Sequence, residues 1–134
     1  MKNIRKGGCL CGATRYEVNL EGHETGNCHC TMCQKHGGAP YQTFTDVPVE
    51  NFKWLTEPNG RVDSSKKSWR MFCKDCGSPI SFRSEGEVDS VSFTTATLDD
   101  PSGLMASYEI YTRSRLEGVL PVEGAKQFDE GGIF

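Results

Sequence analysis

The sequence predicts an all-β domain with little helix, folded around zinc knuckles. Short segments alternate between apolar and polar residues, are rich in β-branched and aromatic side chains, and are separated by glycine and proline turns. Seven cysteines are gathered in three tight clusters. With 134 residues, 36% of them hydrophobic, the chain has the size of a single domain, residues 1–134. We expect its hydrophobic core to be small and bound metal to assist in stabilising it.

The expected strands follow the alternating segments in chain order. They cover residues 13–18, 41–47, 69–73, 79–83, 90–95 and 107–112. Turn residues separate them at 21–22, 37–38, 58–60, 85–86 and 99–103. A single helical turn is expected from Cys33 to His36, because Gly37 and Gly38 end it at once. Residues 121–134 lack periodicity, so we expect an irregular tail or an appendage at a sheet edge.

Charge and hydropathy exclude two classes of partner. The net charge is -3, and the basic residues are scattered among acidic ones, so a phosphate-tracking surface for nucleic acid is not expected. The polar start of the chain, residues 1–6, is followed by no apolar signal region, and no apolar run approaches the roughly 20 residues of a membrane span. We therefore expect a soluble cytoplasmic protein.

The outer cysteines form two close pairs, Cys9 with Cys11 and Cys73 with Cys76. Four thiolates complete a tetrahedral zinc site, and the glycines beside both pairs let the backbone curl around an ion. Such a structural zinc would tie the N-terminal hairpin to the second half of the chain. The other interpretation is a redox pair at Cys73 and Cys76, but the βαβ pattern typical of thioredoxin is absent there.

The middle cluster, Cys28, Cys30 and Cys33, offers three ligands for one ion. In an extended chain Cys28 and Cys30 share a face, and Cys33 follows from the next turn. A catalytic zinc keeps three protein ligands and leaves its fourth position to water or substrate. Alternatively, His36 or His29 supplies the fourth ligand and the second site is also structural.

The chemistry of three thiolates favours a thiol as substrate. They leave the zinc site with a net charge of about -1, which makes it a weak acid toward water. A thiol that enters the open position loses its proton and becomes a nucleophile for a small carbonyl. Cations are expected nearby to offset the added charge, and the candidates are Lys35, Arg83, Arg113 and Arg115.

Three motifs in order resemble one known family. Gly8 to Gly12 reads GCLCG, Cys28 to Lys35 reads CHCTMCQK, and Phe72 to Pro79 reads FCKDCGSP. Over about residues 5–117 the chain resembles the glutathione-dependent formaldehyde-activating enzymes, also called the centromere protein V family. Glu109-Ile110-Tyr111 stands where members often carry a His-Ile-Trp-like segment.

The resemblance implies a β-tent of small antiparallel sheets with two zinc ions. The structural ion would be held by the residues that match Cys9, Cys11, Cys73 and Cys76, and the catalytic ion by those that match Cys28, Cys30 and Cys33. The implied activity is that of a carbon-sulfur lyase, which joins glutathione and formaldehyde. With Lys35 as charge partner, the triplet is the expected catalytic site.

Two other function classes stay open at this point. The chain could be a non-catalytic, zinc-ribbon-like module that binds protein and holds two structural zinc ions. It could also be a thiol redox sensor that uses the triplet.

Overall fold

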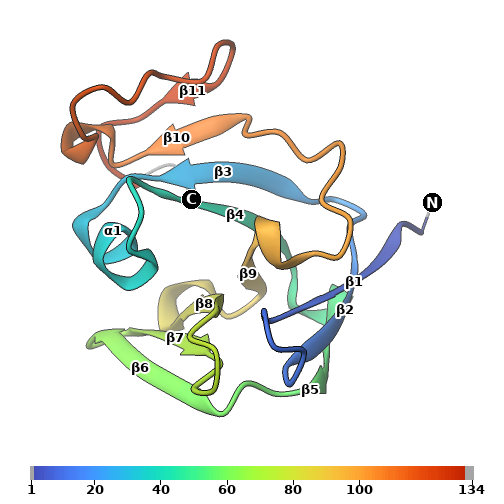
Figure 1. The fold of residues 1–134 in the computed structure, drawn as a ribbon. Helices are drawn as coiled ribbons and strands as arrows, with labels where there is room; N and C mark the ends of the chain where they lie inside the picture. The colour runs from blue at the N-terminus through green and yellow to red at the C-terminus, as the bar shows by residue number, and fades with distance from the viewer. Residues whose placement is uncertain (1, 132–134) are drawn as a thin grey trace.

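The protein consists of two sheets that pack face to face, with a single α-helix among the described residues (Figure 1). The computed structural model describes residues 2–131. Its strands are β1 (Ile4–Gly8), β2 (Arg15–Asn19), β3 (Glu24–Cys28), β4 (Gln42–Pro48), β5 (Phe52–Thr56), β6 (Gly60–Ser65), β7 (Ser68–Phe72), β8 (Pro79–Ser84), β9 (Ser90–Thr94), β10 (Tyr108–Ile110) and β11 (Lys126–Gln127). The helices are α1 (Thr31–Gly37) and the 3-10 turns η1 (Val49–Asn51), η2 (Glu85–Glu87), η3 (Thr95–Thr97) and η4 (Thr112–Ser114).

The smaller sheet has the order β1-β2-β5 and is antiparallel. The larger sheet has the order β11-β10-β3-β4-β9-β8-β7-β6. Its central pairings are antiparallel, whereas β10 runs parallel to both β3 and β11. A parallel pairing needs a long connection, and here the whole chain between β3 and β10 supplies it.

The larger sheet is strongly curved. In Figure 1 one arm of the sheet contains β3 and β4, the other contains β8, β7 and β6, and β9 lies at the bend between them. The helix α1 lies between the two arms. Three strand spacings of about 4.8 Å separate β4 from β7. Nevertheless Arg70 of β7 donates a hydrogen bond to Gln42 of β4 at 3.1 Å. The face that carries these two residues is therefore concave.

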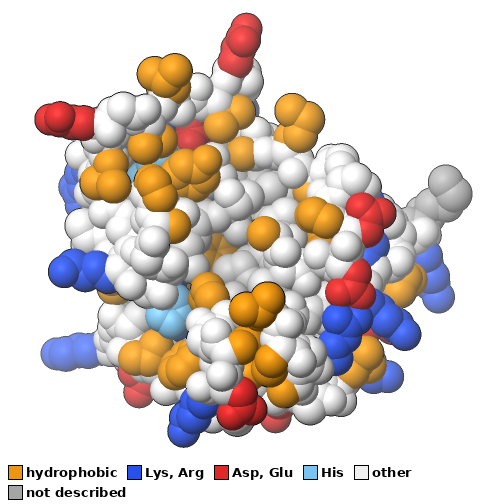
Figure 2. All heavy atoms as spheres, in the orientation of Figure 1, with side chains coloured by type: hydrophobic (Ala, Val, Ile, Leu, Met, Phe, Trp, Pro, Cys, Tyr) orange, Lys and Arg blue, Asp and Glu red, His pale blue; other side chains and the backbone are white. Residues whose placement is uncertain are grey.

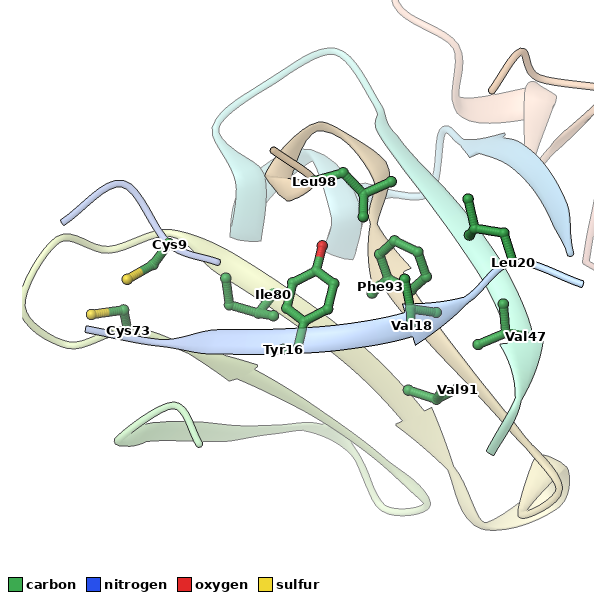
Figure 3. Packing of buried hydrophobic residues seen from close by; sticks show 10 residues of the cluster. All are labelled: Cys9, Tyr16, Val18, Leu20, Val47, Cys73, Ile80, Val91, Phe93 and Leu98. Carbon is green, nitrogen blue, oxygen red and sulfur yellow. The ribbon is translucent and has the colours of Figure 1, made fainter. Parts of the chain in front are cut away.

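The opposite, convex face carries the main hydrophobic core. Val47, Val91 and Phe93 point from it toward Tyr16 and Val18 of β2 (Figure 3). Tyr16 is fully buried, and its ring stacks on Phe52 and packs against Phe93. Alternation along each strand thus sends one set of side chains to this core and the other set to the concave face.

The helix α1 lies on the concave side and is short because both of its ends are capped. Cys30 is the N-cap, and its Sγ accepts a hydrogen bond from the Cys33 amide at 3.3 Å. Gly38 adopts a left-handed φ of 60° at the C-cap, and its amide donates to the Gln34 carbonyl oxygen. The helix confirms the expected turn and begins two residues before it.

The all-β prediction is confirmed, and each expected strand corresponds to a strand of the structure: β2, β4, β7, β8, β9 and β10. Five further strands were not expected: β1, β3, β5, β6 and β11. The tail contains β11, which pairs with β10 at the sheet edge, so its description as an edge appendage holds for residues 126–127. Within residues 2–131 no helix has the length and apolar character needed to cross a membrane. On the face drawn in Figure 2, basic and acidic side chains are interspersed.

Candidate active site

The fold brings the seven cysteines together as two separate groups. One group contains Cys9, Cys11, Cys73 and Cys76, and the other contains Cys28, Cys30 and Cys33. In each group the sulfur atoms all lie within 4.8 Å of one another, and all seven cysteines are free thiols. No histidine, aspartate or glutamate among residues 2–131 joins either group. The division into two outer pairs and a middle triplet is the one that the spacing predicts.

The four-cysteine group joins the turn after β1 to the turn after β7, at one end of the main core (Figure 3). Gly12 and Gly77 have φ values of 85° and 81°, which permit the tight turns that follow Cys9 and Cys73. The Cys9 and Cys11 sulfurs are 3.6 Å apart, and the Cys11 and Cys73 sulfurs 3.7 Å apart. A tetrahedral zinc with bonds of about 2.3 Å requires sulfurs about 3.8 Å apart. The group therefore fits a closed zinc site.

The three-cysteine group is built from the end of β3 and the start of α1. Cys28 closes the strand, Cys30 caps the helix, and Cys33 lies in its first turn. Hydrogen bonds from Cys28 and Cys33 lower the pKa of Cys30 to about 2, while the hydrogen bond with Cys30 raises the pKa of Cys28. One thiolate in the triplet therefore makes ionisation of the other two thiols less favourable. A divalent cation would supply the charge needed to hold three thiolates, so the donor set fits a metal such as zinc.

Arg70 is the cation that the structure places against the triplet. It is 3% exposed, and its two terminal nitrogens lie 3.5 Å and 3.4 Å from Cys33 Sγ. It also donates to Gln42 and lies over the ring of Phe82, with the guanidinium carbon 5.0 Å from the ring centroid. The sequence interpretation did not include Arg70. Its position in β7, in step with buried Ser68, was the available signal.

The four cations expected at the triplet lie elsewhere or at its margin. Lys35 is exposed on α1 and does not line the cavity described below, so a catalytic role for it stays a prediction. Arg113 lines the cavity and pairs with Glu130, and Arg115 pairs with the carboxylate of Glu109. Arg83 lies over Trp69 on the convex face. Charge near the thiols is thus supplied from β7.

The two histidines considered as fourth ligands face other groups. His29 is fully buried, and its Nε2 lies 2.8 Å from Glu109 Oε1. The ring of His36 packs edge-on to Phe72, and burial followed by the nearby charge of Arg70 lowers its pKa. The three-cysteine group is consequently formed without either imidazole.

A cavity of about 470 Å³ opens beside the triplet on the concave face. This volume falls within the range of about 300–1,000 Å³ for small-molecule sites. Its walls include the triplet and Arg70, the apolar side chains of Phe44, Phe82, Ile110 and Tyr111, and a polar group at Asp46, Ser92 and Tyr108. Cysteines of the four-cysteine group do not line it. The triplet, unlike the four-cysteine group, therefore lies in the wall of this cavity, which a substrate could enter.

Two features of the cavity wall were not predicted. Asp46 accepts hydrogen bonds from the hydroxyl groups of Ser92 and Tyr108, and burial raises its pKa. Tyr111 has a left-handed φ of 54°, which costs on the order of 1–3 kcal/mol for a residue with a side chain. Strained residues that line a cavity are often held there for function. The sequence offered no sign of the strain.

A solved structure shares this fold. A crystal structure of a Rhodobacter sphaeroides protein matches with a TM-score of 0.59 and 18% sequence identity. The match covers 92% of this chain and 98% of the other. At this level of identity the likeness concerns the fold alone.

Comparison with curated proteins and with family models goes further. An uncharacterized lyase of Schizosaccharomyces pombe is 30% identical over 77 residues, 58% of this chain and 56% of that protein. A Phaeosphaeria nodorum protein, provisionally named a glutathione-dependent formaldehyde-activating enzyme, is 32% identical over 107 residues, 73% of this chain and 56% of that protein. The chain thus spans little more than half the length of these relatives. The family model described as glutathione-dependent formaldehyde-activating enzyme matches residues 4–114.

Proposed function

Because the chain belongs to the glutathione-dependent formaldehyde-activating enzyme family, we propose that it is a zinc-dependent enzyme of the carbon-sulfur lyase type. It would activate a thiol such as glutathione for addition to, or release from, a small aldehyde such as formaldehyde. The observation that carries the proposal is the position of the three-cysteine group in the wall of a cavity of about 470 Å³. We propose that residues 1–134 act as one domain and that the seven free thiols suit a reducing cytoplasm.

The two cysteine groups would have different tasks. The four-cysteine group would hold a structural zinc that links the turn after β1 in the smaller sheet to the turn after β7 in the larger sheet. Cys28, Cys30 and Cys33 would hold a second zinc with one position left for substrate. When bound there, zinc would lower the pKa of an incoming thiol and keep it as a nucleophilic thiolate.

The chain's own residues would prepare the reaction. Arg70 places positive charge beside Cys33 and offsets the negative charge of an incoming thiolate. Phe44, Phe82 and Tyr111 give the cavity an apolar wall that limits water around a small aldehyde. The thiol loses its S–H proton, a bond forms between sulfur and the carbonyl carbon as the carbonyl π bond breaks, and a proton ends on the former carbonyl oxygen. No electrons are gained or lost in this addition, and the reverse sequence releases the aldehyde.

Zinc analysis with a chelator separates the enzyme from a module with two structural sites. The proposal predicts two zinc ions per chain, one removed by a mild chelator without unfolding and one lost only with unfolding. Cys33→Ser should keep the fold and lose the labile ion, whereas Cys76→Ser should not fold. Equal resistance of both ions, with loss of the fold in both variants, supports the non-catalytic module instead.

Turnover tests the reaction itself. Glutathione and formaldehyde are mixed with the zinc-loaded protein, and the thiohemiacetal S-hydroxymethylglutathione is followed by NMR against the uncatalysed rate. Cys33→Ser serves as the matched inactive control. An unchanged rate with glutathione and with other small thiols would exclude the proposed activity.

A further inference from the structure

Glu109 is a buried carboxylate that gathers hydrogen bonds from several segments of the chain. It is 1% exposed and lies in β10, opposite Asn27 of β3. Oε1 accepts from Asn27 Nδ2 at 3.1 Å and is 2.8 Å from His29 Nε2. Oε2 accepts from Arg115 at 3.1 Å, from the Val122 amide at 3.0 Å and from Gln127 at 2.8 Å. Burial alone would raise the pKa of Glu109, but these hydrogen bonds lower it to about 2.

The Oε1 side of this carboxylate holds the residue between two of the triplet cysteines. His29 stands between Cys28 and Cys30, and its side chain is fully buried. Its amide donates to the Ile110 carbonyl oxygen at 3.1 Å, and its own carbonyl oxygen accepts from Gln34 at 2.9 Å. With the ring held by Glu109, His29 is fixed on three sides. The directions of the flanking cysteine side chains are fixed with it.

The Oε2 side holds the C-terminal segment. Its three donors come from residues 115, 122 and 127, all beyond the stretch 4–114 that matches the family model. Gln127 lies in β11, which pairs with β10 next to Glu109. The carboxylate therefore joins a segment outside the family match to the strand that ends at the triplet.

We propose that Glu109 is a positioning residue that acts through His29 on the cysteine triplet, and that residues 115–127 belong to the support of that site. The inference rests on the proposed zinc at the triplet. Groups that orient metal ligands from outside the coordination sphere affect metal affinity by about 10- to 100-fold. Here the orienting contact reaches the side chain of His29, the residue between two ligands, rather than a ligand itself.

Glu109→Gln tests this with little change in shape. An amide has one acceptor oxygen, so in either orientation its NH2 group faces N–H donors, those of Asn27 or those of Arg115, Val122 and Gln127. Zinc affinity is measured by chelator competition on the full-length zinc-loaded chain, and the triplet is read separately through cobalt substitution. We expect zinc at the triplet to bind about 10- to 100-fold more weakly. Zinc at the four-cysteine group should keep its affinity.

Two further variants complete the test. Glu123→Gln changes an exposed carboxylate of the same C-terminal segment and should leave both sites unchanged. Gln127→Met removes one donor and no charge, so it decides the matter if Glu109→Gln does not fold. Gln127 donates this hydrogen bond to an ionised carboxylate, and hydrogen bonds to charged groups contribute about 1.5–3 kcal/mol net, so its loss corresponds to at most about 10- to 150-fold weaker zinc at the triplet.

A lower melting temperature with unchanged triplet affinity would make Glu109 purely structural and overturn the inference, and so would an equal loss of zinc from both groups. These readouts do not use turnover. A Glu109 variant that loosens the triplet zinc upholds the inference even if the parent protein has no activity toward glutathione and formaldehyde. Conversely, an active parent with an unaffected variant refutes the inference alone.

Discussion

Replacing Arg70 by methionine removes the positive charge that faces the cysteine triplet while keeping an unbranched side chain beside Phe82. Arg70 is 3% exposed and approaches Cys33 Sγ to 3.4 Å. The substitution also leaves the oxygen of Gln42 without the hydrogen bond that Arg70 donates at 3.1 Å. We expect the variant to fold, to keep two zinc ions, and to bind thiols weakly.

The magnitude follows from the distance. Two unit charges 3.4 Å apart interact by about 5 kcal/mol at an effective dielectric constant of about 20. Desolvation offsets much of this, and hydrogen bonds to charged groups contribute about 1.5–3 kcal/mol net. The zinc-loaded triplet carries a net charge of about -1, and a bound thiolate takes it to about -2, so Arg70 favours both steps. In the zinc-loaded protein the loss of Arg70 is measured on thiol binding, whose dissociation constant should rise by about 10- to 150-fold.

Thiol binding can be followed by the sulfur-to-cobalt charge-transfer band of the cobalt-substituted protein as glutathione or 2-mercaptoethanol is added. Arg61→Met is the matched control, because Arg61 also lies over an aromatic ring, that of Trp69, with its guanidinium carbon 4.9 Å from the ring centroid. Arg70→Lys should recover part of the affinity, since it keeps the charge and loses the planar fork. Thiol affinity within about twofold of the parent in Arg70→Met would refute the reasoning.

Two predictions concern stability. In Gly26→Ala the added Cβ would lie 2.2 Å from the Tyr108 ring, so urea unfolding should show a loss of about 1–3 kcal/mol or more, while Gly86→Ala, whose Cβ would meet a single atom at 3.7 Å, should change little. Equal effects of the two would contradict the packing argument. Asp99→Asn should cost less than about 1 kcal/mol at pH 7, because its partner Arg15 is partly exposed. The hydrogen bond from Arg15 lowers the pKa of Asp99, so its contribution is fully present above the unfolded-state pKa near 3.8 and is lost as the pH falls from there through the lowered pKa of the folded state. A stability difference from the parent that grows on acidification would show the opposite sign.

Strands with an apolar face could be predicted, and strands with a polar interior could not. In β9 the alternation of Val91 and Phe93 with serines reveals the buried face directly. β3 lies inside the larger sheet, yet its buried residues are Thr25, Gly26, Asn27 and Cys28. Their contacts are hydrogen bonds, such as the one between the hydroxyl groups of Thr25 and Thr45 at 2.9 Å. A polar interior leaves no hydrophobic period to detect.

The residues of the candidate site likewise divide into those that the sequence predicts and those that only the fold reveals. The cysteine groups could be predicted because ligand spacing is local and the outer pairs complement each other. Arg70 and Glu109 could not, since their partners Cys33 and His29 are 37 and 80 residues away in the sequence. A charged residue within a strand reads as exposed until the fold shows what faces it. The preference for Lys35 came from its closeness in sequence to the triplet.

The curvature of the larger sheet makes binding at the site a property of the whole sheet. The contacts of Arg70 in β7 with Gln42 in β4 and with Cys33 in α1 connect the two arms of the sheet across its concave face. A ligand that fills the concave side should resist flattening of the sheet and slow amide hydrogen exchange in strands that it never touches. Substitutions in β9, at the bend, should in turn tune the site from a distance by changing how far the arms open.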